Sequence, residues 1–150
     1  EPPILTSNIS TFADKRRIAI SRDAFIRLGG VHYELGEMDE AIKIYDQVSG
    51  LAPRVVPVLA QHFIDNGQIG RAEYHVRRGV ESLRRTLETD PNQSELWEQL
   101  YEILMVSKNH EVAMNLLKSA ETQTTDRLVL AQILRLQSKV LMDFSRLDVS

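Results

Sequence analysis

The amino-acid sequence predicts an all-α fold in which about three helix pairs follow one another along the chain. Aromatic residues make up 6% of the 150 residues and only seven glycines occur, which disfavours a β-sandwich or a barrel. Leu, Ala, Glu, Arg and Gln, which favour helices, are common instead. A second observation is a spacing of apolar and small residues around a turn that returns in three registers. We therefore expect helix pairs that stack, with a flanking helix at each end.

Composition limits the classes of function. The chain has no cysteine, which excludes a disulfide scaffold, a thiolate metal site and a cysteine nucleophile. Its 18 Lys and Arg against 21 Asp and Glu give a net charge of −3, so no nucleic-acid partner is expected, because phosphate binding needs a basic face. No apolar run reaches the roughly 20 residues that span a bilayer. We expect a soluble protein with no membrane span; the lack of cysteine slightly favours the cytoplasm, and the compartment stays open.

The N-terminal segment leads into the first helix. Residues 1–10 include two adjacent prolines and are expected to form an extended leader. Thr11 then resembles a helix N-cap. Two alternatives are open for the next part of the chain: one continuous helix over about residues 11–35, or a helical extension over 11–21 that breaks near 21–23. Neither glycine nor proline interrupts the first part of this stretch, which favours the continuous helix.

Residues 22–53 are expected to form the first repeat, in which two amphipathic segments flank a turn at Gly36. Gly36 supplies the positive φ that the C-terminal end of a helix favours, and Pro53 closes the unit. The first segment places four apolar or small residues on one helical face: Phe25, Leu28, Gly29 and His32. The second segment has the same kind of face, formed by Ala41, Tyr45 and Val48.

Residues 54–91 repeat this register around a glycine turn at 67–70. The packed face of the first helix is expected to consist of Val56, Leu59, Ala60 and Phe63. The second helix is expected to continue to about Thr89, some two turns beyond the usual length of a repeat of this kind, because one apolar stripe continues: Ala72, Val76, Val80, Leu83 and Leu87. Arg and Glu alternate on this helix at i, i+4 spacing, as in Arg77–Glu81 and Arg84–Glu88, which indicates a salt-bridged exposed face rather than a nucleic-acid patch.

Residues 94–125 form the third expected repeat, and it departs from the pattern in three places. Lys108 stands where the turn glycine is expected, Tyr101 takes a small-residue position, and Thr125 replaces the closing proline. Packing is expected to be looser there. The matching residues are Trp97, Leu100 and Leu104 in the first helix and Ala113, Leu117 and Ala120 in the second.

Residues 126–146 are expected to form a C-terminal helix capped by Asp126. Its apolar residues cover more than one stripe, unlike those of a polar helix that ends a stack of repeats: Leu128, Leu130, Ile133, Leu134, Leu136, Val140, Leu141, Met142 and Phe144. Two alternatives are open. Either one broad face is buried on the third repeat, or the helix is an interface for self-association or for a further domain.

These motifs resemble the tetratricopeptide repeat (TPR), a 34-residue helix-turn-helix unit. The first repeat matches best, through Phe25, Leu28, Gly29, Gly36, Ala41, Tyr45 and Pro53. The resemblance covers roughly residues 22–127. It implies one TPR-like domain over residues 1–150, built as a right-handed α–α superhelix, or solenoid. Such a fold has a concave surface formed mainly by the first helices of the pairs.

The inward positions of that family give candidate partner-binding residues: Asp23, Ile26, Tyr33, Glu34, Gln61, Ile64, Asp65, Glu95, Glu98, Glu102 and Met105. This surface is acidic with an apolar floor, so a basic or amphipathic peptide is the expected partner. Some relatives clamp a carboxylate tail with Lys, Arg and Asn. That function is not expected here, because the corresponding positions hold Ile26, Gly30, Glu95 and Gln99. The alternative is that the glutamates form a solvated helix face.

No residue pattern indicates catalysis. The four histidines lack the spacing of a metal site, and the glycines belong to a helix and to turns rather than to a phosphate loop. We expect no catalytic residue, cofactor or metal, and no enzyme. The expected function is a non-catalytic protein–protein interaction scaffold. The alternative is a regulatory or targeting TPR module of a larger polypeptide, enzymatic or not.

Overall fold

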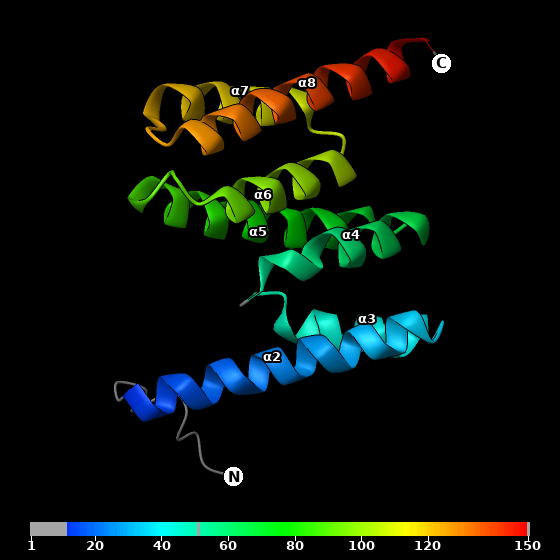
Figure 1. The fold of residues 1–150 in the computed structure, drawn as a ribbon. Helices are drawn as coiled ribbons and strands as arrows, with labels where there is room; N and C mark the ends of the chain where they lie inside the picture. The colour runs from blue at the N-terminus through cyan, green and yellow to red at the C-terminus, as the bar shows by residue number, and fades with distance from the viewer. Residues whose placement is uncertain (1–11, 51, 150) are drawn as a thin grey trace. The chain divides into compact units, whose positions relative to one another are not determined.

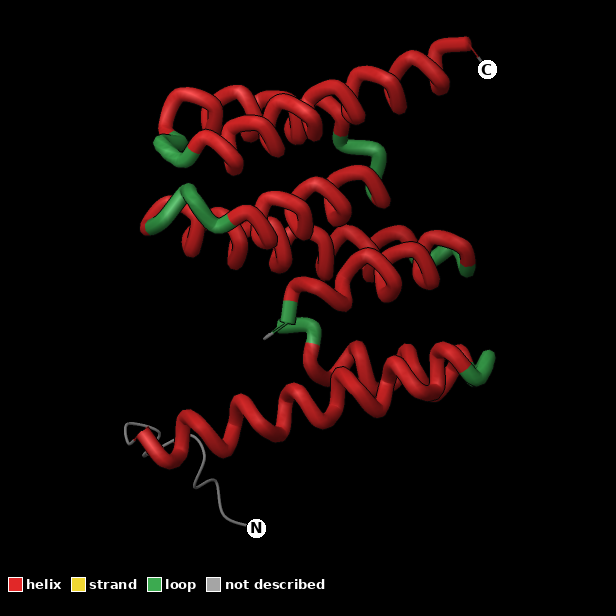
Figure 2. The backbone as a smooth tube through the Cα atoms, viewed as in Figure 1, coloured by secondary structure: helices red, strands yellow, loops and turns green. Residues whose placement is uncertain are grey.

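The computed structural model describes the backbone of residues 12–50 and 52–149, and within these ranges the chain is helical with short turns and without strands (Figures 1 and 2). The leader expected for residues 1–10 lies outside the described residues. The chain divides into two compact units, residues 1–52 and 53–150. The all-α prediction is therefore confirmed, and the single stacked domain over 1–150 stays a prediction.

The first unit contains α2 (Phe12–Glu34) and α3 (Met38–Val48). Helix α2 is uninterrupted, which confirms the continuous alternative for the N-terminal segment. The two helices approach closely at Gly29, where a Cβ atom would lie 2.5 Å from Cε1 of Tyr45. Phe25 and Leu28 share the register of Gly29 but are 42% and 47% exposed. A small residue at position 29 is what allows this helix pair to form.

The second unit contains a 3₁₀ turn, η1 (Pro53–Val55), followed by five helices: α4 (Val56–Asp65), α5 (Ile69–Thr89), α6 (Ser94–Val106), α7 (His110–Gln123) and α8 (Arg127–Val149). Helix α5 ends at Thr89, as its apolar stripe predicts. Helix α8 begins as predicted, because the Asp126 carboxylate accepts a hydrogen bond from the Leu128 amide at 2.8 Å. It continues past the predicted end at residue 146, as far as Val149.

The helices of the second unit pack in sequence order. Helix α4 packs on α5, α5 on α6, and α7 on both α6 and α8 (Figure 1). Ile103, Ile133 and Leu136 are completely buried among them. Gly79 lets α5 approach both neighbours, since a Cβ atom there would lie 3.1 Å from Ile103 and 3.3 Å from Val56. The predicted stripe of α5 is buried as expected, except that Val80 is only half-buried.

Three helix–helix turns have the same backbone geometry. In each, one residue has a positive φ: Gly36 (+80°), Gly67 (+75°) and Lys108 (+59°). The next amide donates to a carbonyl five residues back, which closes the preceding helix. These bonds are Glu37 N to His32 O (2.8 Å), Gln68 N to Phe63 O (2.7 Å) and Asn109 N to Leu104 O (2.9 Å). The repeated helix-turn-helix register is therefore present in the backbone, including the turn where lysine replaces glycine.

Replacing Lys108 by glycine is expected to raise the free energy of unfolding by about 1 kcal/mol, because a left-handed conformation strains a residue with a Cβ atom and glycine adopts it freely. Urea denaturation measures the change. Lys108→Ala is the matched control, since it removes the charge and keeps the strain. Equal stabilisation by both variants would show that the lysine charge, not the backbone angle, is the cause.

None of the helices in the described part of the chain is long and apolar enough to cross a membrane.

Candidate functional site: a groove in the second unit

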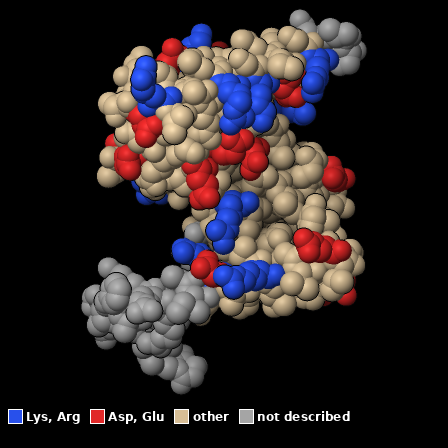
Figure 3. Space-filling view, viewed as in Figure 1, with Lys and Arg blue, Asp and Glu red and all other residues tan. Residues whose placement is uncertain are grey.

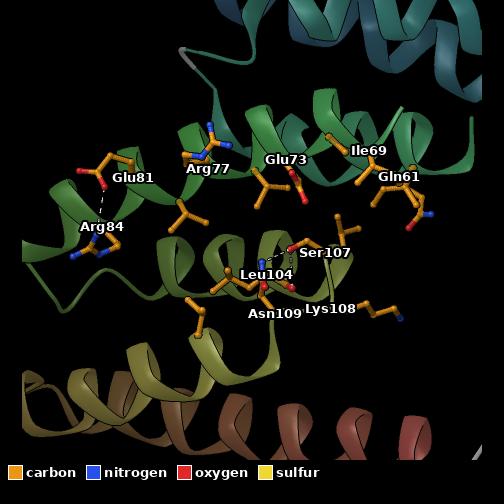
Figure 4. Close-up of a pocket in the computed structure, with 16 residues that line it drawn as sticks. Gln61, Ile69, Glu73, Arg77, Glu81, Arg84, Leu104, Ser107, Lys108 and Asn109 are labelled. Atoms are coloured by element: carbon orange, nitrogen blue, oxygen red, sulfur yellow. Dashed lines mark hydrogen bonds and ion pairs between the residues drawn. The ribbon is translucent and has the colours of Figure 1, made fainter. Parts of the chain in front are cut away.

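A groove of about 750 Å³ opens in the second unit, between α5 and the turn that joins α6 to α7 (Figure 4). It exists because of how the helices pack. Helix α5 packs mainly on α4 and α6, whereas α7 packs mainly on α8 and α6. The side of α5 that points toward the α6–α7 turn is therefore left uncovered. The C-terminal end of α4 closes the groove on one side with Gln61 and Ile64.

The floor of the groove is apolar. Val76 of α5 and Leu104 of α6 are buried beneath it, and Val80 lies half-buried between them and solvent. Ile69 and Val112, at the ends of α5 and α7 that face the groove, are 48% and 45% exposed. An incoming apolar side chain therefore contacts this floor without having to displace a hydrogen-bonded group.

Charged residues of both signs line one edge of the groove. They lie on α5 with the spacing i, i+4, i+8, i+11, and in order they are Glu73, Arg77, Glu81 and Arg84. Arg84 Nη1 lies 3.3 Å from Glu81 Oε1 and Nη2 lies 3.8 Å from Glu88, so the predicted salt-bridged face is confirmed there. The expected Arg77–Glu81 pair does not form, and Arg77 pairs with no carboxylate of the described residues. Across the groove, the turn contributes Lys108 and Asn109.

The predicted partner-binding residues are distributed over both units. Four of them lie on α2 in the first unit: Asp23, Ile26, Tyr33 and Glu34. In the second unit only Gln61 and Ile64 line the groove. The Gln61 amide donates to the Asp65 carboxylate at 2.8 Å, so Asp65 is engaged along α4. A single binding surface that includes residues of both units stays a prediction.

The predicted acidic residues of α6 lie outside this groove. The Glu98 carboxylate accepts a hydrogen bond from Gln132 at 3.1 Å and lies 3.5 Å from Arg135 and 4.0 Å from Lys139, all on α8. Acidic side chains accordingly lie directly beside basic ones in the upper part of Figure 3. Glu95 and Glu102 are exposed and Met105 is half-buried, and none of the three lines the groove. The charge of Glu98 is thus balanced within the chain by α8.

Helix α8 also makes a polar contact with α7. His110 Nε2 lies 2.6 Å from Asp143 Oδ2, and the His110 ring is buried with the Phe144 ring 5.6 Å away. The hydrogen bond with His110 holds the pKa of Asp143 below its usual value, against the opposing effect of partial burial. This contact anchors the C-terminal half of α8 on the first turn of α7.

Asp143→Asn is expected to destabilise the protein near neutral pH and to have a smaller effect in acid. A carboxyl group with a lowered pKa in the folded state stabilises the fold above its ordinary pKa, about 4, and loses that contribution as the pH falls through the lowered value. The difference in unfolding free energy between wild type and variant should therefore shrink from pH 6 toward pH 3. Chemical denaturation at a series of pH values measures it, and a difference independent of pH would contradict the assignment.

Sequence reasoning missed the α5 wall of the groove because the resemblance places binding on first helices. The signal was present in the alternation of Glu and Arg beside an apolar stripe. In the described residues no group of three His, Asp or Glu side chains is arranged to hold a metal ion. Comparisons of the chain with protein-family models, curated proteins and solved structures gave no match. The function is therefore inferred from the groove itself.

Proposed function

We propose that the chain is a non-catalytic interaction scaffold that binds a segment of a protein in the groove of the second unit. The observation that carries the proposal is the groove itself, about 750 Å³ with an apolar floor and a charged edge. This volume lies within the usual range of ligand sites. Apolar anchors supply most of the affinity in such sites, and charges at the edge select the partner.

The shape of the groove favours an amphipathic helix as its ligand. Residues of α5 line it from Ile69 to Arg84, a length of about 22 Å, or four helical turns. A helix with apolar residues at i, i+3, i+4 and i+7 presents a matching stripe. Two glutamates and three cations line the groove, the cations being Arg77, Arg84 and Lys108. An amphipathic partner with charges of both signs therefore suits it better than a purely basic peptide.

The three matching turns support the further proposal that the helix pairs stack as a TPR-like solenoid. One observation favours the second candidate function, a regulatory or targeting module of a larger polypeptide. Helix α8 exposes apolar side chains that a further domain could cover: Leu134, Leu141, Met142 and Phe144. Binding in the groove is compatible with both functions.

Selection of peptides tests the proposal. A displayed library of 16-residue peptides is enriched on the immobilised chain, and the dissociation constants of the winners are measured by fluorescence anisotropy. Ile69→Glu, at the mouth of the groove, is expected to weaken them at least about tenfold by placing a charge on apolar surface. Leu141→Glu is the matched control, since Leu141 is 58% exposed on α8 and lies outside the groove. Failure to enrich any peptide, or equal losses in both variants, would overturn the proposal.

A further inference from the structure

We propose that α5 of a second copy of this chain occupies the groove, running antiparallel to α5 of the first copy about a twofold axis. This inference rests on the proposed function, because it names the partner of the same groove. A twofold interface must be self-complementary: where one residue faces a second residue of the other copy, the reverse contact occurs as well, and a residue at the axis faces its own counterpart. The charged edge of α5 meets this condition.

The edge reads negative, positive, negative, positive along the helix: Glu73, Arg77, Glu81 and Arg84. An axis near residue 79 places Glu73 opposite Arg84 of the second copy and Arg77 opposite Glu81 of the second copy. Each pair then occurs twice, giving four attractive contacts. A parallel arrangement in the same register would instead oppose like charges. The pattern therefore selects the antiparallel twofold arrangement.

The apolar surface is placed to support the same arrangement. Val80 lies half-buried on the groove side of α5 and next to the axis, so the apolar surface of one α5 faces that of the other. The open space beside α5 gives the second helix room to enter. Arg77 gains a carboxylate partner, which it lacks among the described residues. The existing Glu81–Arg84 pair is exposed on the surface, and such pairs rearrange at low cost.

Helix α8 is a weaker candidate for such an interface. Its exposed side chains, among them Leu141 and Phe144, are also apolar. Its neighbouring cations Arg135 and Lys139 already face Glu98 of the same chain, so no unpaired charge pattern specifies what would cover the stripe. Of these two surfaces, the α5 edge is the one that combines apolar surface with self-complementary charge.

Sedimentation of the full chain over a dilution series tests the inference. The wild type is expected to form a dimer that dissociates on dilution. Arg77→Glu and Glu81→Arg, examined separately, should each raise the dimer dissociation constant at least about tenfold, because like charges then face each other twice. An equimolar mixture of these two variants should restore dimers, since the introduced glutamate of one chain faces the introduced arginine of the other. Only a contact between chains predicts rescue by mixing.

Arg78→Glu is the matched control. Arg78 is the adjacent residue and is exposed, but it donates to the Tyr74 hydroxyl at 3.1 Å and does not line the groove, so this variant should dimerise like the wild type. Circular dichroism confirms that each variant is folded. A chain that is monomeric at every concentration, or a mixture that is not rescued, would overturn the inference. If groove-specific peptides still bind such a monomer, the proposed function stands and only the identity of the partner is wrong.

Discussion

Ile103→Ala is expected to lower the free energy of unfolding of the second unit by about 2–5 kcal/mol. Ile103 is completely buried in α6, and its Cδ1 atom lies beside Gly79 at the close approach of α5. Truncation removes apolar contacts and leaves a cavity. The surrounding helices cannot fully close it, because Gly79 on the opposite side of the cavity has no side chain that could fill the space.

Trp97 fluorescence during urea denaturation measures this effect. It is the single tryptophan of the chain, it is buried in the same helix, and its indole donates to the Pro91 carbonyl at 2.7 Å. Its signal therefore reports on the second unit. Ile69→Ala is the matched control, because Ile69 is nearly half exposed and should lose far less stability. Equal losses at positions 69 and 103 would contradict the packing of α6 against α5.

The parts of the fold that depend on local chemistry could be predicted from the sequence. The helix ends depend on turn residues and caps, so Gly36, Gly67 and Asp126 mark boundaries that the structure confirms. The end of α5 at Thr89 is set by the length of one apolar stripe. Lys108 occupies a glycine position, and the turn keeps its geometry because the flanking helices fix the backbone there.

The candidate site could be predicted only in part, because it depends on which helices cover which faces. Val80 belongs to a stripe that indicates core, yet it is half-buried because α7 packs on α8 and leaves this part of α5 open. Glu98 lies on a face of α6 that the register identifies, but the register carries no information about α8 as its partner. Gln61 and Ile64 stand at inward positions that the resemblance implies, and they are the two candidates of the second unit that line the groove.

Helix α5, with 21 residues, is longer than α3 of the first repeat, which has 11. The extra turns of α5 extend its charged edge as far as Arg84 and Glu88. A helix of the first repeat's length would end before the second half of the alternating pattern. The added length therefore supplies Glu81 and Arg84, the residues that make the edge self-complementary.

Gly29→Ala is expected to destabilise the first unit by about 1–3 kcal/mol, the usual cost of overpacking. The added Cβ atom would lie 2.5 Å from Cε1 and 2.9 Å from Cδ1 of Tyr45, with Ile44 Cγ2 at 3.3 Å. The Tyr45 ring is buried and has little room to rotate away, so the helices must move apart. This loss outweighs the gain of up to about 1 kcal/mol that alanine offers within a helix.

Gly30→Ala is the matched control, because its Cβ atom would meet only the Tyr45 hydroxyl, at 3.8 Å. There the helix-forming gain should remain, and the variant should be as stable as the wild type or more stable. Hydrogen exchange of the α2 and α3 amides measures both effects within the unit. In a Tyr45→Ala background the Gly29→Ala change should become neutral or stabilising, since the ring that the added Cβ atom would contact is absent. A loss that persists without the ring would mean that the backbone of α2, rather than its contact with α3, requires glycine at this position.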